Sequence, residues 1–255
     1  MTDHNLLPAL SLTLLAGLST VLGSVAALPG GRRQGRFLSL ALAFSAGVML
    51  YISMAEILPK ARAALESCLP ARRAAGAAAA LFLLGALLML LLERLLPDPL
   101  PRDGKETSCG RAAALTALSI GLHNFPEGLV TFLTALQDPV AALPVAFAIA
   151  IHNLPEGVAV AVTVRRAGGS FRAALFLSVL SGLAEPAGAF LGWLLLGQLP
   201  VSAAVGLLFA PVAGIMVYLS LFELLPAAEE APRALRVSAA MGGMALMALS
   251  LLLFL

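Results

Sequence analysis

The chain has 255 residues, of which 60% are hydrophobic and only 12% are charged, and its formal net charge is +2. Soluble domains have about 25% charged residues, so this composition excludes an ordinary soluble protein, because the chain has too few polar groups to cover its apolar surface. The small net charge, with no basic patch interleaved with aromatic residues, also excludes a nucleic-acid-binding protein. A lipid bilayer is therefore the expected environment.

Clusters of Gly, Pro and charged residues divide the chain into eight apolar segments, each near the ~20 residues that a membrane-crossing helix needs. The segments are continuously apolar and do not alternate in polarity, which predicts helices and not the strands of a barrel. Short connections favour a single domain, residues 1–255, forming one all-α bundle with a longer polar loop at about 93–111. The expected spans are 6–28, 37–58, 74–92, 112–135, 140–164, 173–197, 202–225 and 237–255.

Most of the 16 Lys and Arg residues lie in the alternate connections that follow spans one, three, five and seven. The positive-inside rule places these connections in the cytoplasm. Both termini are then expected outside, and the polar loop at 93–111 inside. The residue usage, rich in Leu, Ala and Arg, and the compact loops favour a bacterial inner membrane protein.

Two segments near the ends of spans two and seven have matching sequences, Tyr-Ile-Ser-Met-Ala-Glu-Ile-Leu-Pro at 51–59 and Tyr-Leu-Ser-Leu-Phe-Glu-Leu-Leu-Pro at 218–226. On the expected topology span two runs outward and span seven inward, so the copies form an inverted repeat. Inverted repeats around a midplane site are common in transporters. The polar residues of the two copies are open to a pathway role, a gating role or a structural role, and they are Glu56, Glu223, Ser53 and Ser220.

A hexapeptide that occurs twice is the most informative feature, His-Asn-Phe-Pro-Glu-Gly at 123–128 and His-Asn-Leu-Pro-Glu-Gly at 152–157. Each copy lies in the middle of an apolar span, where one carboxylate costs roughly 2.5–3.5 kcal/mol. At this spacing the His, Asn and Glu side chains project to one side of a helix. Because spans four and five are antiparallel, the two copies are expected to meet near the membrane centre.

These buried acids have no Lys or Arg inside the spans to pair with, apart from residues at the span edges. The remaining ways to accommodate them are protonation, hydrogen bonding, water access or a bound cation. Pro126 and Pro155 each lack an N–H group and free one backbone carbonyl, which is typical of the irregular backbone around ion pathways. Glu185 in span six adds a further carboxylate next to a proline. The serines Ser53, Ser181 and Ser220 are expected to bond backbone carbonyls.

At these residues the chain resembles the ZIP (Zrt/Irt-like) family of divalent metal transporters, in particular its bacterial ZupT-like branch. The resemblance covers eight spans, outward termini and the paired HNxPEG motifs, and it implies a binuclear metal site. One metal ion would be bound by His123, Glu127, His152 and Glu156. The second would be bound by Asn124, Asn153 and Glu185, with Glu127 and Glu156 available as bridges. Asn153 stands where some ZIP proteins have an acidic residue.

The expected function is uptake of divalent cations into the cytoplasm, Zn²⁺ foremost, together with Fe²⁺, Mn²⁺, Co²⁺ and Cd²⁺. Imidazole and carboxylate ligands suit these ions, which are the transported substrate, and no prosthetic cofactor is expected. The expected partners are the metal ions, the lipid bilayer and a second copy of the chain. A homodimer is suggested by the small residues Gly182, Gly188 and Gly192, which are typical of helix interfaces in membranes.

Two other functions are compatible with buried acids and imidazoles. An intramembrane metalloenzyme is one, but the sequence has neither an HExxH motif nor a nucleophile elbow, so we do not expect an enzyme. A proton or cation channel that uses the glutamates without a metal is the other. Metal dependence separates them, because a channel would conduct protons in the presence of a chelator and an enzyme would turn over a substrate without net flux.

Overall fold

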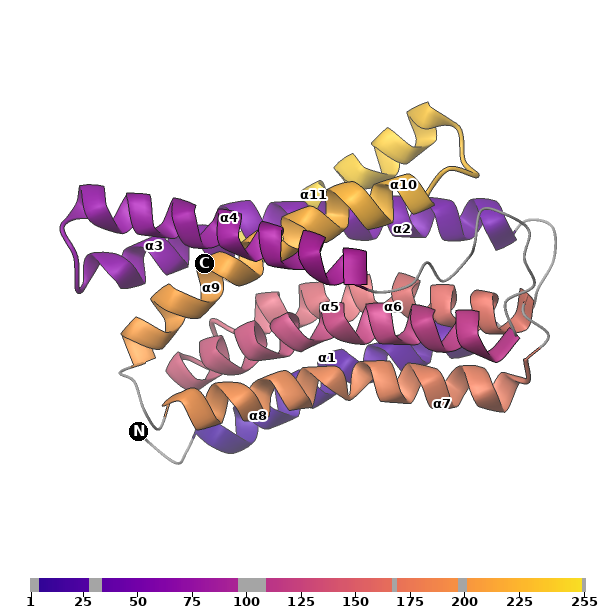
Figure 1. Cartoon of the computed structure of the whole chain (residues 1–255), viewed down its shortest axis with the longest axis horizontal. Helices are drawn as coiled ribbons and strands as arrows, with labels where there is room; N and C mark the ends of the chain where they lie inside the picture. The colour runs from indigo at the N-terminus through magenta and orange to yellow at the C-terminus, as the bar shows by residue number, and fades with distance from the viewer. Residues whose placement is uncertain (1–4, 28–33, 96–108, 167–168, 197–200, 254–255) are drawn as a thin grey trace.

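The computed structural model describes residues 5–27, 34–95, 109–166, 169–196 and 201–253, and every regular element within these ranges is a helix (Figure 1). The first elements are α1 (Leu6–Ala26), α2 (Gln34–Ile52), the π-helix η2 (Ser53–Ile57), α3 (Leu58–Glu66) and α4 (Ala71–Leu95). The long helices α5 (Cys109–Gln137) and α6 (Leu143–Arg166) follow. The last elements are α7 (Phe171–Gly182), α8 (Ala184–Leu196), α9 (Val201–Leu219), the π-helix η3 (Ser220–Leu224), α10 (Leu225–Ala227) and α11 (Arg233–Leu253).

Seven helical segments of the described chain are long and apolar enough to cross a membrane, which confirms an all-α membrane protein. These segments are Leu6–Ala26, Gly35–Glu66, Ala71–Leu92, Leu143–Arg165, Phe171–Leu191, Val205–Ala227 and Arg233–Leu252. The remaining expected span, 112–135, falls within α5, a helix of 29 residues whose side chains are described only in part. Most of the expected polar loop at 93–111 lies outside the described residues.

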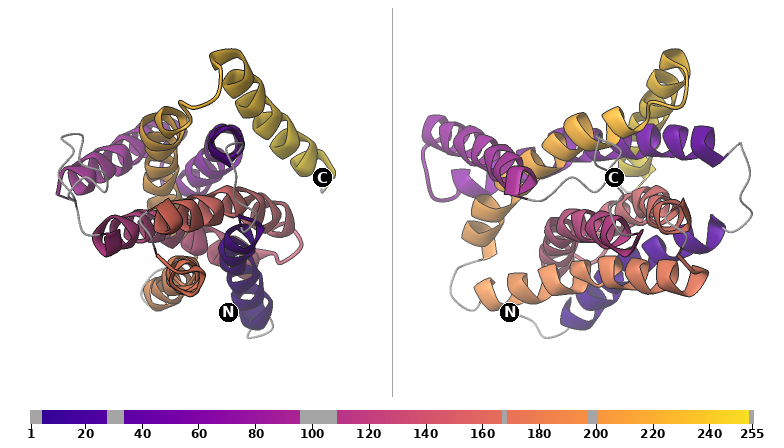
Figure 2. Two further views of the ribbon diagram at one scale, coloured as in Figure 1. Left: turned by 90° about the vertical axis from the view of Figure 1, so that its right-hand side faces the viewer. Right: turned by 45° about the vertical axis from the view of Figure 1, so that its right-hand side comes forward.

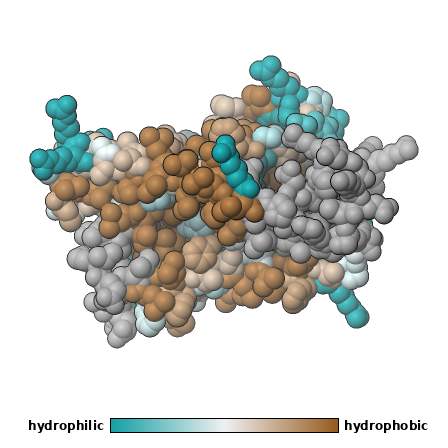
Figure 3. All heavy atoms as spheres, in the orientation of Figure 1, coloured by the Kyte–Doolittle hydropathy of each residue, from teal (hydrophilic) through white to brown (hydrophobic). Residues whose placement is uncertain are grey.

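Apolar side chains form much of the outer surface. Leu15 and Leu83 are 65% and 64% exposed, and many other leucines on α1, α4 and α11 are exposed as well. Figure 3 shows hydrophobic residues over the middle of one face, with hydrophilic residues mostly toward its two ends. Among the seven candidate spans, the one formed by α6 is the most enclosed, while α4 and α11 are the least. Such a surface is stable only where lipid replaces water around it.

The second span differs from its expected end at residue 58. The helix continues through η2 and α3 to Glu66, with Pro59 in the first turn of α3. The N–H of Leu58 bonds to the carbonyl of Ser53, which is the i→i+5 pattern of a π turn. Pro59 has no N–H to continue the α-helical pattern, and the wider turn just before it lets the helix proceed. Proline therefore does not end this span.

The same π turn occurs in the matching segment, where η3 follows α9. The N–H of Leu225 bonds to the carbonyl of Ser220, and Pro226 follows in the first turn of α10. The matching sequences at 51–59 and 218–226 thus form the same local structure. This result supports their assignment as a structural repeat.

The helices form two groups, which are separated most clearly in the left view of Figure 2. In the first group α1 packs on α6, and α8 packs on α5, with α7 beside α1, α5 and α6. In the second group α2 packs on α11, and α4 packs on α9, with α3 beside α4 and α9. Contacts between α2 and α6 and between α5 and α9 join the groups.

Glycines show that contacts within the first group come in equivalent pairs. Gly23 of α1 lies against the carbonyl of Leu154, and Gly188 of α8 lies against the carbonyl of Phe125. Leu154 and Phe125 hold the same position in the two hexapeptides. Gly17 and the last residue of α7, Gly182, lie against each other's carbonyls, so a side chain at either position would clash with the other's backbone. The α1 segment at 17–23 is therefore the counterpart of the segment at 182–188.

The second group repeats this relationship. Gly47 of α2 lies against the carbonyl of Ala240 in α11, and Gly214 of α9 lies against the carbonyl of Phe82 in α4. An exchange of α1 and α2 with α8 and α9, of α4 with α11 and of α5 with α6 therefore maps these four helix contacts onto one another. The close approaches also correct one expectation. Gly182 and Gly188 are used for packing inside the chain and not on a dimer face, because neighbouring backbones already occupy the space beside them.

Candidate metal site

The predicted ligand residues gather where α5, α6 and α8 meet. Those with a described side chain are all essentially inaccessible to solvent, and they are Asn124, Glu127, His152, Asn153, Glu156 and Glu185. His123 lies one turn before Glu127 on α5, and its side chain is outside the described part of the structure. Both α5 and α6 continue as helices through their internal prolines, Pro126 and Pro155. The hexapeptides thus project their polar side chains from continuous α-helices.

His152 of α6 faces Glu127 of α5. The distance between Nε2 of His152 and Oε2 of Glu127 is 3.0 Å, and both side chains are buried. On its other side, Nδ1 of His152 lies 3.0 Å from the carbonyl oxygen of Ala148. A proton on Nδ1 is held by that carbonyl, which leaves the Nε2 lone pair directed toward the carboxylate. A lone pair and a carboxylate oxygen at this separation need a proton or a cation between or beside them.

Asn153 and Glu185 form the contact between α6 and α8. Nδ2 of Asn153 donates to Oε1 of Glu185 at 2.5 Å and to the carbonyl of Ala16 in α1 at 3.1 Å. These two bonds direct the amide oxygen of Asn153 away from both acceptors. That oxygen has no hydrogen-bond partner in the described structure. The arrangement therefore presents a fixed neutral oxygen ligand.

The amide of Asn124 in α5 can be placed in two orientations, which differ by exchange of Oδ1 and Nδ2 and have different partners. In one orientation Nδ2 faces Oγ1 of Thr20 at 3.5 Å and the carbonyl of Ser181 at 3.4 Å, which directs the amide oxygen toward Glu156. In the other, Nδ2 donates to Oε2 of Glu156 at 2.9 Å and to the carbonyl of Ile120 at 3.1 Å. The second suits an empty site, because an amide oxygen facing a carboxylate oxygen is repelled. The first suits a site in which a cation lies beside Glu156.

Several buried oxygen atoms at the junction have no hydrogen-bond partner in the described structure. Among them are Oε1 of Glu127, Oδ1 of Asn153 and Oε2 of Glu185. An unsatisfied buried polar atom costs about 1–3 kcal/mol, and more when it is charged. Carboxylate, amide and imidazole atoms together are the ligands of Zn²⁺ and of other divalent transition metals. In their present positions, however, no three His, Cys, Asp or Glu side chains with described placement form a group that could hold a metal ion.

The candidate pathway residues lie in the second helix group. Glu56 is on η2 and Glu223 on η3, and both are partly exposed. Glu56 pairs at 2.5 Å with Lys60, a partly exposed residue just beyond the expected end of span two. The pair forms because the helix continues past Pro59 and brings Lys60 one turn after Glu56.

The serines of the two repeats satisfy backbone carbonyls as expected. Ser53 Oγ donates to Met49 at 2.6 Å, and Ser220 Oγ donates to Met216 at 2.8 Å. Ser181 differs, because its hydroxyl has no hydrogen-bond partner among the described residues. Its backbone carbonyl, and not its hydroxyl, contacts the site through Asn124.

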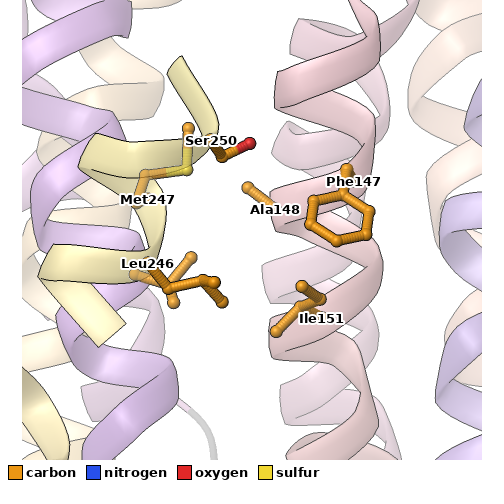
Figure 4. A pocket seen from close by; sticks show the side chains of 7 residues that line it. Phe147, Ala148, Ile151, Leu246, Met247 and Ser250 are labelled. Carbon is orange, nitrogen blue, oxygen red and sulfur yellow. The ribbon is translucent and has the colours of Figure 1, made fainter. Parts of the chain in front are cut away.

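A separate pocket lies on the α11 side of α6. Figure 4 shows Phe147, Ala148 and Ile151 of α6 facing Leu246 and Ser250 of α11 across it. Its lining is almost entirely apolar and contains no acidic, imidazole or amide side chain. The pocket therefore offers no ligands for a metal ion and is distinct from the junction of α5, α6 and α8.

Sequence reasoning missed the contribution of α1. The carbonyl of Ala16 and the hydroxyl of Thr20 contact the two asparagines. A signal for this contribution exists in the sequence, since Gly-Leu-Ser-Thr-Val-Leu-Gly at 17–23 aligns with Gly-Leu-Ala-Glu-Pro-Ala-Gly at 182–188. The alignment is too short to find without the contacts that reveal it.

The fold and the junction define a helical membrane protein with a buried candidate site for divalent cations. The description "ZIP Zinc transporter" belongs to a family model that matches residues 102–251. Proteins named zinc transporter ZupT are similar over the whole chain, with 46% identity to that of Streptococcus mutans and 48% to that of Corynebacterium efficiens, each covering 100% of both chains. The protein of Nitratidesulfovibrio vulgaris is 46% identical over 99% of both chains. The chain therefore belongs to the ZIP zinc transporter family, in its ZupT branch, and not to a family of enzymes.

Proposed function

We propose that the protein transports Zn²⁺ across the membrane into the cytoplasm through the junction of α5, α6 and α8. Family membership and the names of the full-length relatives support zinc as the substrate. The chemistry of the junction supports it independently, because imidazole and carboxylate groups are zinc ligands. The ion is cargo and not a resident cofactor.

The contact between His152 and Glu127 is the observation on which the proposal mainly depends. Their facing atoms are 3.0 Å apart inside a membrane span, and the Ala148 carbonyl favours a proton on the opposite ring nitrogen. A structural hydrogen bond needs a donor on one of the facing atoms. A transport site needs two ligands that bind the same cation. When the cation leaves, the two ligands share a proton instead.

The ligand set is proposed to hold two ions, as the family resemblance implies. His123, Glu127, His152 and Glu156 would bind one ion, and Asn124, Asn153 and Glu185 the other, with Glu127 and Glu156 as bridges. Fe²⁺, Mn²⁺, Co²⁺ and Cd²⁺ are proposed as further substrates, since mixed nitrogen and oxygen ligands do not exclude them. Neutral Asn153 limits the negative charge of the second position.

The equivalent contacts of the two halves support transport by alternating access. Halves that exchange contacts by a two-fold relation, if inserted in opposite directions, can form outward-open and inward-open states of similar energy. Glu56, Glu223, Ser53 and Ser220 are proposed to lie on the pathway or to gate it, since they occupy equivalent π turns. Eight spans, outward termini, a bacterial inner membrane location and a homodimer complete the proposal.

Uptake of radioactive zinc into proteoliposomes tests the function directly. Glu156→Gln should reduce uptake at least tenfold, because it removes a buried charge from the ligand set. The matched control is Glu66→Gln, which neutralises a glutamate at the end of α3 that pairs with Arg62 on the surface. A Glu156→Gln protein with wild-type uptake would refute the site. Proton flux that persists with a chelator present, without zinc uptake, would favour a proton channel instead.

A further inference from the structure

The two asparagines of the hexapeptides have equivalent partners. Nδ2 of Asn153 faces the carbonyl of Ala16 and Oε1 of Glu185. In its matching orientation, Nδ2 of Asn124 faces the carbonyl of Ser181 and Oγ1 of Thr20. Ala16 and Ser181 each precede the paired glycines of α1 and α7, so the same exchange of halves relates both sets of contacts.

Thr20 therefore occupies the position of Glu185 in the other half. It is fully buried on α1, and its backbone carbonyl lies against Gly157, just as the carbonyl of Glu185 lies against Gly128. The one chemical difference at this position is the side chain. An ionised carboxylate only accepts hydrogen bonds, whereas a hydroxyl both donates and accepts.

This difference bears on which amide can turn. Glu185 holds the Nδ2 group of Asn153 toward itself, which fixes the amide oxygen. In one orientation of Asn124, Nδ2 faces the Thr20 hydroxyl and the Ser181 carbonyl, and in the reverse orientation it donates to Glu156 and to the carbonyl of Ile120. The orientation with Oδ1 toward Glu156 supplies two oxygen ligands to a cation, and the reverse orientation satisfies Glu156 when no cation is present.

We propose that Thr20 is a positioning residue of the cation site, whose hydroxyl accepts from Nδ2 of Asn124 and so supports the orientation that presents the amide oxygen to the cargo. Asn153 is then the fixed amide ligand and Asn124 the switching one. This inference rests on the proposed function, since it concerns the same site.

The test measures the zinc Kd of the purified full-length protein in detergent, by competition with a zinc-binding dye, and zinc uptake kinetics in proteoliposomes. Thr20→Val keeps the shape of the side chain and removes the hydroxyl. Loss of one hydrogen bond should raise the Kd about three- to tenfold. Thr20→Ser restores the hydroxyl and should return the Kd to within about twofold of the wild type.

A matched control lies on the same helix. Thr13 is also fully buried, but its hydroxyl bonds to the carbonyl of Ala9 in its own helix at 2.8 Å. Thr13→Val should leave the zinc Kd unchanged even if it lowers the melting temperature. If Thr20→Val does not fold, Thr20→Ala replaces it in the comparison with Thr20→Ser.

A second background separates positioning from packing. In the Asn124→Asp protein both terminal atoms of the side chain are oxygens, so the two orientations are equivalent. In this background Thr20→Val should change the zinc Kd by less than about twofold. A packing defect would instead raise the zinc Kd by the same factor in both backgrounds.

Two results would overturn the inference: a Thr20→Val protein with wild-type Kd, or a full loss of affinity that persists with Asn124→Asp. A wild-type protein that binds no zinc would instead overturn the proposed function.

Discussion

The carboxylate of Glu56 lies 2.5 Å from Nζ of Lys60, one helical turn away and on the far side of Pro59. The pair is partly exposed, with 22% of the Glu56 side chain and 37% of the Lys60 side chain accessible. Screening by solvent limits such pairs to about 0–1 kcal/mol. The surroundings of Glu56 therefore differ from those of Glu127, whose side chain is fully buried and faces the imidazole of His152.

Lys60→Gln should therefore lower the free energy of unfolding by less than about 1 kcal/mol and leave zinc uptake within about twofold of the wild type. Thermal unfolding in detergent and proteoliposome uptake measure the two effects. Arg62→Gln is the control, because it breaks the neighbouring exposed pair with Glu66. A large loss of uptake confined to Lys60→Gln would show instead that the pair controls the ion pathway.

Glu127→Gln should raise the zinc Kd at least tenfold, since it replaces the charged oxygen that faces His152 with a neutral group. Isothermal titration calorimetry on the purified protein measures the affinity. Glu185→Gln should have a smaller effect, because Asn153 already neutralises part of that carboxylate through a hydrogen bond. The reverse order of the two effects would show that the α8 side, and not the imidazole side, dominates binding.

Gly17→Ala should destabilise the protein by about 1–3 kcal/mol, as expected for overpacking, because the added methyl group would clash with the carbonyl of Gly182. Gly76→Ala is the matched control on α4, where nothing lies within 4 Å of an added methyl group. That change should stabilise the helix by about 0.5–1 kcal/mol. Melting temperatures in one detergent compare the two. Equal behaviour would contradict the close crossing of α1 and α7.

Zinc at about 100 times its Kd should stabilise the protein by about 2.7 kcal/mol if it binds only the folded state. The expected observation is a higher melting temperature that a chelator reverses. Mg²⁺ should shift the melting temperature far less, because it retains its water shell and prefers six oxygen ligands. An equal shift with Mg²⁺ would indicate general charge screening and not a site with imidazole.

Local sequence predicts the helices of this protein well but not all of their ends. Long apolar segments predict membrane helices because each one satisfies its own backbone hydrogen bonds in lipid. In the sequence Pro59 predicts the end of a helix, yet the preceding π turn lets the helix continue to Glu66. The competing signals are local, but the outcome depends on packing of η2 and α3 against α9.

The amino-acid sequence was sufficient for the class of protein, the paired hexapeptides and six buried residues of the candidate site, since hydropathy and helical periodicity are properties of a single segment. The role of α1 was not accessible in that way. Thr20 faces Asn124, and α1 crosses α7 at Gly17 and Gly182, because helices that are distant in the chain approach each other closely. Contacts of this kind depend on the packing of several helices at once, so they follow from the assembled bundle and from no segment considered separately.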